Sequence, residues 1–133
     1  MSCNSAIYTN NQTATAIPAG GLIPFGTIIR RFCSRHLNAG DSAITVCGKG
    51  YYDVSVSATM VATGAGIATI ALQSDGANVP GATASTTVAA GDTFNLDITA
   101  LIREFDCNTS NLTLVLTGVA ATVTNISTVV KKI

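Results

Sequence analysis

The sequence predicts an all-β domain, and three observations support that prediction. Several segments alternate apolar and polar residues with a period of two, which is typical of strands that bury one face. Turn residues, mainly Gly, Asp, Asn and Pro, separate these segments at short intervals. No segment combines the 3.6-residue period of an amphipathic helix with residues that cap a helix.

Residues 1–21 differ in composition from the rest of the chain. They are rich in Asn, Thr and Ala, they show no hydrophobic period, and they end in the turn sequence Pro18-Ala-Gly-Gly21. These features predict an extended N-terminal arm or linker that is loosely ordered unless a partner holds it. The globular domain is then expected over residues 22–133.

The clearest predicted strand runs from Tyr51 to Met60. Its even-numbered residues are all apolar, and the odd-numbered residues from Asp53 to Thr59 are all polar. Seven further strands are expected: Thr27–Phe32, Ala43–Val46, Gly66–Gln73, Ala82–Val88, Phe94–Arg103, Leu112–Thr117 and Thr122–Val130. A short helical turn at Thr99–Phe105 is the only alternative to a strand. The sequence Asp75-Gly76 predicts a tight hairpin turn, and many short strands joined by turns predict a β-sandwich or a β-barrel.

Composition limits the possible partners. Seven basic and seven acidic residues cancel, and charged residues make up only 11% of the chain, so we expect neither nucleic acid nor an anionic membrane as a partner. Hydrophobic residues reach 47% and the mean hydropathy is +0.44, yet no apolar run approaches the ~18 residues of a transmembrane helix. The apolar excess predicts a second buried surface between copies of the chain. Residues 1–10 lack the pattern of a secretory signal, which predicts production in a cytoplasm.

Catalysis is not predicted. The chain has one histidine, His36, and no Gly-x-Ser-x-Gly sequence, so a Ser-His-Asp site has no recognisable basis. Gly64-Ala-Gly66 lacks the remaining residues of a phosphate-binding loop. The acidic residues that lie closest together are Asp92, Asp97, Glu104 and Asp106. We interpret them as turn and surface carboxylates, and the alternatives are general acid–base chemistry or calcium binding.

The four cysteines are Cys3, Cys33, Cys47 and Cys107. Reduced thiols are expected, because a cytoplasm keeps thiols reduced. One alternative is a disulfide between Cys33 and Cys47, which flank a loop. Another is a zinc site in which His36 joins these two cysteines, although a second closely spaced pair of ligands is missing. The sequence therefore predicts no metal and no cofactor.

A small basic cluster consists of Arg30, Arg31 and Arg35. We interpret it as charge at a strand edge that opposes aggregation. The alternative is an ion pair across an oligomer, with Asp53 or Glu104 as the acidic partner. The chain has no Trp and few other aromatic residues, so an aromatic platform for saccharides is not predicted.

Several motifs occur in an order that resembles one known family. They are Gly50–Thr59, with its Gly-Tyr-Tyr opening, Leu72–Gly81 with its Val-Pro-Gly turn, Leu114–Gly118, the terminal Val129–Lys132 and Ile23–Thr27. Together they resemble the C-terminal globular domain of the collagen-like exosporium glycoproteins of bacterial spores, which belongs to the tumour-necrosis-factor/complement-head superfamily. The resemblance covers roughly residues 22–133.

The resemblance implies a jelly-roll β-sandwich that assembles as a homotrimer and has no catalytic site. Candidates for the trimer interface or the core are Tyr51, Tyr52, Val54, Val56, Phe94, Leu114 and Leu116. The chain departs from the family because it lacks the Gly-X-Y repeats of a collagen stalk.

The chain also resembles short proteins of this type among phage and prophage virion components. Our first hypothesis is therefore a virion component made in the host cytoplasm, either a capsid decoration protein or a fibre or tip protein. Residues 1–20 would attach it to the particle, with Tyr8, Ile17 and Pro18 as the anchoring candidates. The alternatives are a structural protein of the spore surface and a trimeric adhesin that binds a receptor or a glycan.

Overall fold

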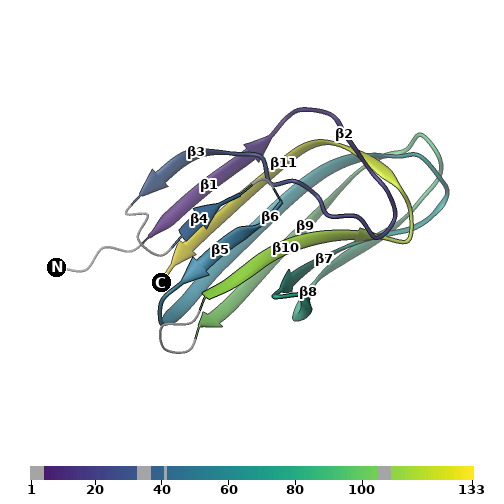
Figure 1. Ribbon diagram of the computed structural model, residues 1–133. Helices are drawn as coiled ribbons and strands as arrows, with labels where there is room; N and C mark the ends of the chain where they lie inside the picture. Colours follow the sequence, from purple (N-terminus) through teal and green to yellow (C-terminus); the bar gives the residue numbers. More distant parts are fainter. Residues whose placement is uncertain (1–4, 33–36, 41, 105–108) are drawn as a thin grey trace.

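The computed structural model describes residues 5–32, 37–40, 42–104 and 109–133 (Figure 1). All regular structure in these residues is β-strand, and no helix that could cross a membrane is found in them. The strands are β1 (Ala6–Asn11), β2 (Thr15–Ile17), β3 (Thr27–Phe32), β4 (Leu37–Ala39), β5 (Ile44–Cys47), β6 (Gly50–Ala62), β7 (Gly66–Ser74), β8 (Ala77–Val88), β9 (Thr93–Glu104), β10 (Thr109–Thr117) and β11 (Ala121–Lys132). The all-β prediction is confirmed.

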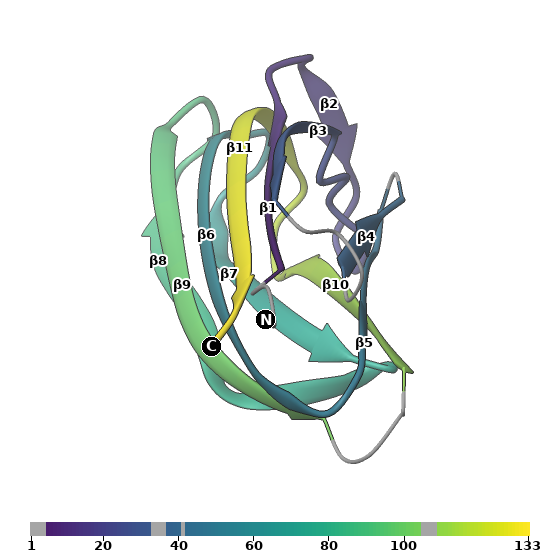
Figure 2. The same cartoon turned by 90° about the vertical axis from the view of Figure 1, so that its left-hand side faces the viewer.

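The strands form two antiparallel sheets. Sheet A has the order β3-β1-β11-β6-β9, with β2 paired to the start of β11, and sheet B has the order β4-β5-β10-β7-β8. Figure 2 shows β9, β6, β11 and β1 side by side as one layer, with β4, β5 and β10 of sheet B on the right. From β5 onward the chain crosses between the sheets after every strand except at the β7–β8 hairpin, and this connectivity makes a jelly-roll sandwich.

The core lies between the two sheets. Because side chains alternate along a strand, one face of each long strand points into this core. The central strands β6 and β10 supply much of it. Their fully buried residues include Tyr52, Val54, Ala58, Met60, Leu112, Leu114 and Leu116. Phe25, from the segment between β2 and β3, is buried against them. Each fully buried side chain of this size stabilises the fold by about 1.5–3 kcal/mol.

The prediction of an N-terminal arm is wrong for the described part of residues 1–21. Strand β1 lies inside sheet A, paired with β11 on one side and β3 on the other. The inward residues at this strand are Ser5, Ile7 and Thr9, all buried. Because two of these three are small and polar, the sequence shows no hydrophobic period here. Residues 5–21 are therefore part of the sandwich.

Most other predicted strands are confirmed within a few residues. Ala82–Val88 belongs to a longer strand, β8. The alternative of a helical turn at Thr99–Phe105 is wrong for its described residues, because β9 continues as a strand to Glu104. The predicted Asp75-Gly76 turn joins β7 to β8, and both residues have positive φ, at 52° and 84°. Such φ values at both central residues are typical of a two-residue hairpin turn, and Gly adopts them without strain.

Candidate functional site

The face of sheet A that points away from sheet B is the broadest candidate surface. Pairing aligns its residues in rows across β1, β11, β6 and β9. The rows are Ala6, Lys131, Asp53 and Leu101; then Tyr8, Val129, Ser55 and Thr99; then Asn10, Ser127, Ser57 and Asp97, with Tyr51 and Arg103 at one end. We call these residues the outer A face.

Large apolar side chains are exposed near one end of the outer A face. Leu101 is 58% exposed, Tyr51 45% and Val129 38%, and the chain ends beside them at Ile133, which is 66% exposed. The backbone N–H of Ile133 donates to the carbonyl oxygen of Tyr51 at 2.9 Å, so the terminal residue stays next to β6. Exposed apolar residues that gather in this way mark interaction surfaces, whereas single ones are ordinary.

The charges on this face are few and of both signs. The Lys131 ammonium lies 3.9 Å from the Asp53 carboxylate, and the two side chains are 58% and 36% exposed. The Arg103 guanidinium lies over the Tyr51 ring, 5.7 Å from its centroid. Such a cation–π contact holds the aromatic ring against the sheet. The outer A face therefore has no strong field of either sign to repel a second copy.

A shallow hollow of about 330 Å³ occupies the middle of the outer A face. It lies beside Val129 and Asp97, and its floor is formed by the small side chains Ser55, Ser57 and Ser127. Because serine reaches only a short distance from the backbone, a side chain from outside can lie against the sheet here.

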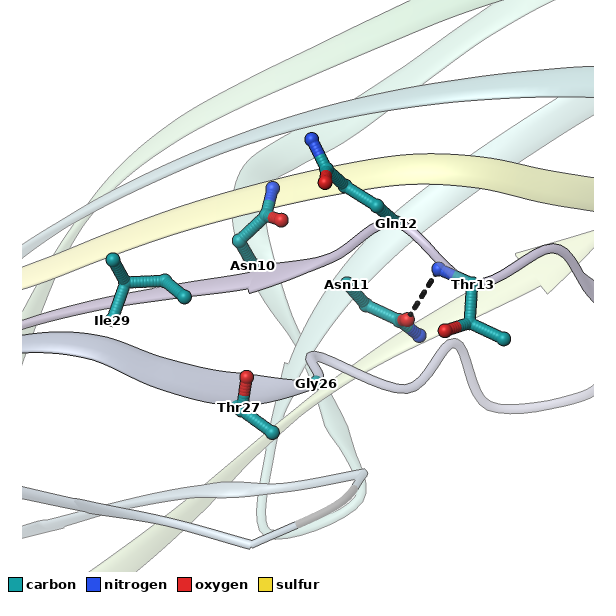
Figure 3. Close-up of a pocket in the computed structure, with 7 residues that line it drawn as sticks. All are labelled: Asn10, Asn11, Gln12, Thr13, Gly26, Thr27 and Ile29. Atoms are coloured by element: carbon teal, nitrogen blue, oxygen red, sulfur yellow. Dashed lines mark hydrogen bonds between the residues drawn. The ribbon is translucent and has the colours of Figure 1, made fainter.

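A second hollow, of about 280 Å³, lies where β1 ends and β3 begins (Figure 3). Its lining consists of Asn10, Asn11, Gln12, Thr13, Gly26, Thr27 and Ile29. We call it the amide pocket, because three carboxamide side chains line it. Figure 3 shows Asn10, Gln12 and Ile29 rising on the same side of the strands.

A buried polar cluster occupies the end of the sandwich at which β9 stops. The Tyr52 hydroxyl donates to the carbonyl oxygens of Cys47 and Gly48, at 2.8 and 2.9 Å. Burial, and then the nearby Cys47 and Glu104, raise the pKa of Tyr52 to about 12. Glu104 accepts a hydrogen bond from the Ser110 hydroxyl, and its other carboxylate oxygen has no hydrogen-bond partner among the described residues.

The predicted interface and core candidates lie in two different places, the core and the outer A face. Five of them lie in the core, namely Tyr52, Val54, Val56, Leu114 and Leu116, and Phe94 is partly buried against it. Only Tyr51 lies on the outer A face. Sequence reasoning missed Leu101, Val129 and Ile133 as surface candidates. The alternation of β9 and β11 contained that signal for Leu101 and Val129, because both are apolar residues at positions where the outward residues are otherwise mainly polar, and Ile133 directly follows β11.

The three anchoring candidates also lie in different environments. Ile17 is buried in the core and cannot reach a partner, Tyr8 is half-buried on the outer A face, and Pro18 is exposed after β2. Their expected role as a flexible arm does not agree with these positions.

The remaining predicted sites do not assemble. Asp92 accepts a hydrogen bond from the Ala89 N–H in the β8–β9 turn, Asp97 lies on the outer A face, and Glu104 is buried. Within residues 5–32, 37–40, 42–104 and 109–133, no three His, Cys, Asp or Glu residues are grouped to hold a metal. Arg30 and Arg31 are exposed on the edge strand β3, as expected of charge at a strand edge. The residues Cys3, Cys33, Arg35, His36, Asp106 and Cys107 lie outside the described residues, so the disulfide and zinc alternatives stay predictions.

No protein-family model and no curated protein matches the chain in sequence. Solved structures match it in fold. The Eiger tumour necrosis factor from S. frugiperda has a TM-score of 0.73 at 11% identity, over 98% of this chain and 91% of that chain. The globular domain of zebrafish complement 1qA has a TM-score of 0.64 at 7% identity, over 93% and 94%. The PRD1 vertex protein P5 has a TM-score of 0.63 at 15% identity, over 97% and 96%.

The TM-scores show a shared fold, and at identities of 7–15% they show nothing about function. The chain has the jelly-roll sandwich of the tumour-necrosis-factor and complement-head structures, which confirms the predicted fold class. The predicted likeness to exosporium glycoproteins stays a prediction, as does the homotrimer.

Proposed function

We propose that this protein is a non-enzymatic structural component of a virion and that it functions as a homotrimer. The observation that carries the proposal is the fold, because nearly the whole chain superposes on nearly the whole of a vertex protein, PRD1 P5. The expected family resemblance implies a threefold assembly, and the outer A face offers a surface for it.

The outer A face suits a contact between copies for three reasons. It exposes several large apolar side chains, its charges balance, and its centre is hollow. In a closed ring of three, each contact is heterologous, so a protruding part of one copy meets a different part of the next. The hollow beside Val129 is the receiving part in this arrangement, and a stable contact needs about 1,000 Å² of total buried surface.

The described residues support a role without catalysis. Their buried ionisable groups serve the fold, since Tyr52 bonds to backbone carbonyls and Glu104 bonds to Ser110. The acidic side chains Asp92 and Asp97 lie apart in the turn before β9 and in its middle. One hydroxyl does donate to a carboxylate, Ser110 to Glu104, but both side chains are buried.

Attachment to the particle is proposed to use the exposed end of the sandwich near Pro18. Ile17 is buried, and Tyr8 lies on the face that the trimer would cover. Pro18 follows β2, and the backbone there is held by hydrogen bonds to β10, including Gly20 N–H to Leu116 O at 2.6 Å. A rigid, exposed turn can present a small contact to a larger assembly.

The first experiment measures the mass of the assembly by native mass spectrometry at micromolar concentration. The expected result is three chains of 13.5 kDa each. Leu101→Asp is expected to give a monomer, because it puts a charge into the proposed contact. Ile67→Asp is the matched control, since Ile67 is equally exposed, at 59%, but lies on the outer side of sheet B. A monomeric wild-type protein, or a trimer that only Ile67→Asp dissociates, would contradict the proposal.

The particle role needs a separate test. We expect the protein to co-purify with phage particles and Pro18→Asp to reduce its incorporation without changing its trimeric mass. Purification only with spores would instead support the spore-surface alternative. Binding of the free trimer to cells, with no particle association, would support the adhesin.

A further inference from the structure

We propose that the amide pocket binds a single neutral sugar unit. This inference goes beyond the structural role. All lining residues come from one chain, so the pocket needs no second copy, and Asn10 is the lining residue that it shares with the outer A face proposed for the trimer contact. It lies at the β1–β3 edge of sheet A, formed by the last residues of β1, the residues that follow them and the start of β3.

The chemistry of the lining selects a neutral, hydroxyl-rich ligand. Asn10, Asn11 and Gln12 provide carboxamides, each of which both donates and accepts hydrogen bonds, and two threonines add hydroxyl groups. Sugar hydroxyls likewise donate and accept. No ionisable side chain lines the pocket, so an anion or a cation would lose its hydration without gaining a charged partner.

Part of this lining is held in place before any ligand arrives. The amide nitrogen of Asn10 donates to Asn125 Oδ1 at 3.0 Å and lies 3.1 Å from both Ile126 O and Ser127 Oγ. These acceptors, all on β11, fix the orientation of the carboxamide. Among the described residues, no donor reaches its oxygen, which is therefore free to accept a hydrogen bond from a ligand. A fixed polar group costs less to use in binding than a mobile one.

The loop after β1 is fixed in the same way. The Asn11 side-chain oxygen accepts a hydrogen bond from the Thr13 N–H at 3.0 Å, which closes a local turn and fixes the side chain of this lining residue. Gly26, opposite, has φ of +89°, and a Cβ there would overlap the carbonyl oxygen of Asn10 and the Cβ of Asn11. Only glycine allows β3 to begin this close to β1.

A β-bulge supplies the apolar wall. The register of β1 against β3 shifts between Tyr8 and Thr9, which pair with Arg30 and Ile28, so Ile29 is the extra residue. Its side chain is 52% exposed and lines the pocket. Bulges redirect side chains and are frequent beside functional sites. The apolar C–H face of a sugar ring can pack against such a side chain, which replaces the aromatic platform that the sequence lacks.

The size of the pocket limits the ligand and its affinity. At about 280 Å³, the pocket is just below the range of ~300–1,000 Å³ that is usual for small-molecule sites, so it suits one sugar ring. A ligand of that size binds with a Kd of about 1 mM when each of its non-hydrogen atoms contributes the usual binding free energy. Three copies in a trimer would add avidity toward a surface that displays many such sugars.

The experiment uses saturation-transfer NMR on the full-length protein with four probes. They are the methyl glycosides of glucose, galactose, mannose and N-acetylglucosamine, each at millimolar concentration. At least one is expected to receive saturation from the protein. Thr27→Phe is expected to abolish that transfer, because the larger ring would fill the pocket. Gln12→Ala is expected to weaken binding about 2-fold to 10-fold through one lost hydrogen bond.

The controls separate binding from folding. Gln12 is exposed and makes no hydrogen bond to other described residues, so Gln12→Ala should keep the wild-type melting temperature even if Thr27→Phe does not fold. Asn78→Ala removes an exposed carboxamide from β8 in sheet B and should bind like the wild type. The proposal is overturned if none of the four probes receives saturation, or if Gln12→Ala and Thr27→Phe bind like the wild type. Stronger binding of sulfate, or of an extended peptide along β3, would overturn it equally.

Discussion

Replacing Tyr52 by Phe tests the energetics of the buried end of the sandwich. Tyr52 is fully buried, and its hydroxyl has only the carbonyl oxygens of Cys47 and Gly48 as described partners. Phe keeps the ring and removes the hydroxyl, so it leaves two partly buried carbonyls without this donor. The free energy of unfolding is expected to fall by about 1 to 1.5 kcal/mol at pH 8.

The same residue predicts a dependence on alkaline pH. The pKa of Tyr52 is raised from 10.0 to about 12 in the folded protein. Below pH 10 the tyrosine is protonated in both states, and its contribution to stability is fully present. Between pH 10 and pH 12 the unfolded chain loses the proton and the folded chain keeps it, so this contribution is lost as the pH rises. At pH 11 the loss is about 1.4 kcal/mol, which corresponds to one pH unit.

The loss caused by Tyr52→Phe at pH 8 and the loss in the wild type between pH 8 and pH 11 have a similar size, so the two proteins should become equally stable at pH 11. Urea unfolding at fixed protein concentration should show the wild type more stable than Tyr52→Phe at pH 8 and about equal to it at pH 11. Every other side chain is the same in both proteins, so its contribution cancels in the difference. A difference between the two proteins that stays constant from pH 8 to pH 11 would refute the assigned environment of Tyr52.

Two further substitutions test the core and one turn by the same urea measurement at pH 8. Leu114→Ala, in the centre of β10, should lower the free energy of unfolding by about 2 to 5 kcal/mol through the cavity that it leaves, whereas a loss below 1 kcal/mol would mean that Leu114 is not in the core. Gly118→Ala should be destabilising as well, because Gly118 has φ of +87° and a Cβ would overlap the carbonyl oxygen of Ile67. The comparison is Gly91→Ala, because Gly91 has a similar φ of +88° but open space where the Cβ would be added. If both substitutions lower the free energy of unfolding equally, backbone strain and not the overlap with Ile67 causes the loss.

The sequence predicts the strands that have a clear division between core and surface. In β6, Val54, Val56 and Ala58 alternate with Asp53, Ser55 and Ser57, and every member lies on the expected side. Period-two alternation is a direct consequence of strand geometry, so it needs no knowledge of the partner strands. The Asp75-Gly76 turn is local for the same reason, since its φ values are set by two residues.

The parts that sequence reasoning missed depend on contacts distant in the chain. Strand β1 is identified by its pairing with β11, more than 100 residues later, where Thr9 lies opposite Thr128. Both threonines are buried, and neither hydroxyl has a described hydrogen-bond partner. Buried polar residues remove the hydrophobic signal of a strand, so composition alone made this segment look like a linker. The short strands β2 and β4 give even less signal, because three residues contain little more than one period.

The misread segment is also the one that builds the amide pocket. An arm outside the fold would leave Asn10, Asn11 and Gln12 free in solvent, where carboxamides bind water and select nothing. Pairing of β1 with β11 places the Asn10 amide against Asn125 and Ser127, and pairing with β3 brings Ile29 and Thr27 beside it. The polar composition that suggested an arm therefore has a different cause. It supplies the inner hydroxyls of a sheet strand and, at the end of that strand, the carboxamides of a pocket that exists only when both neighbouring strands are in place.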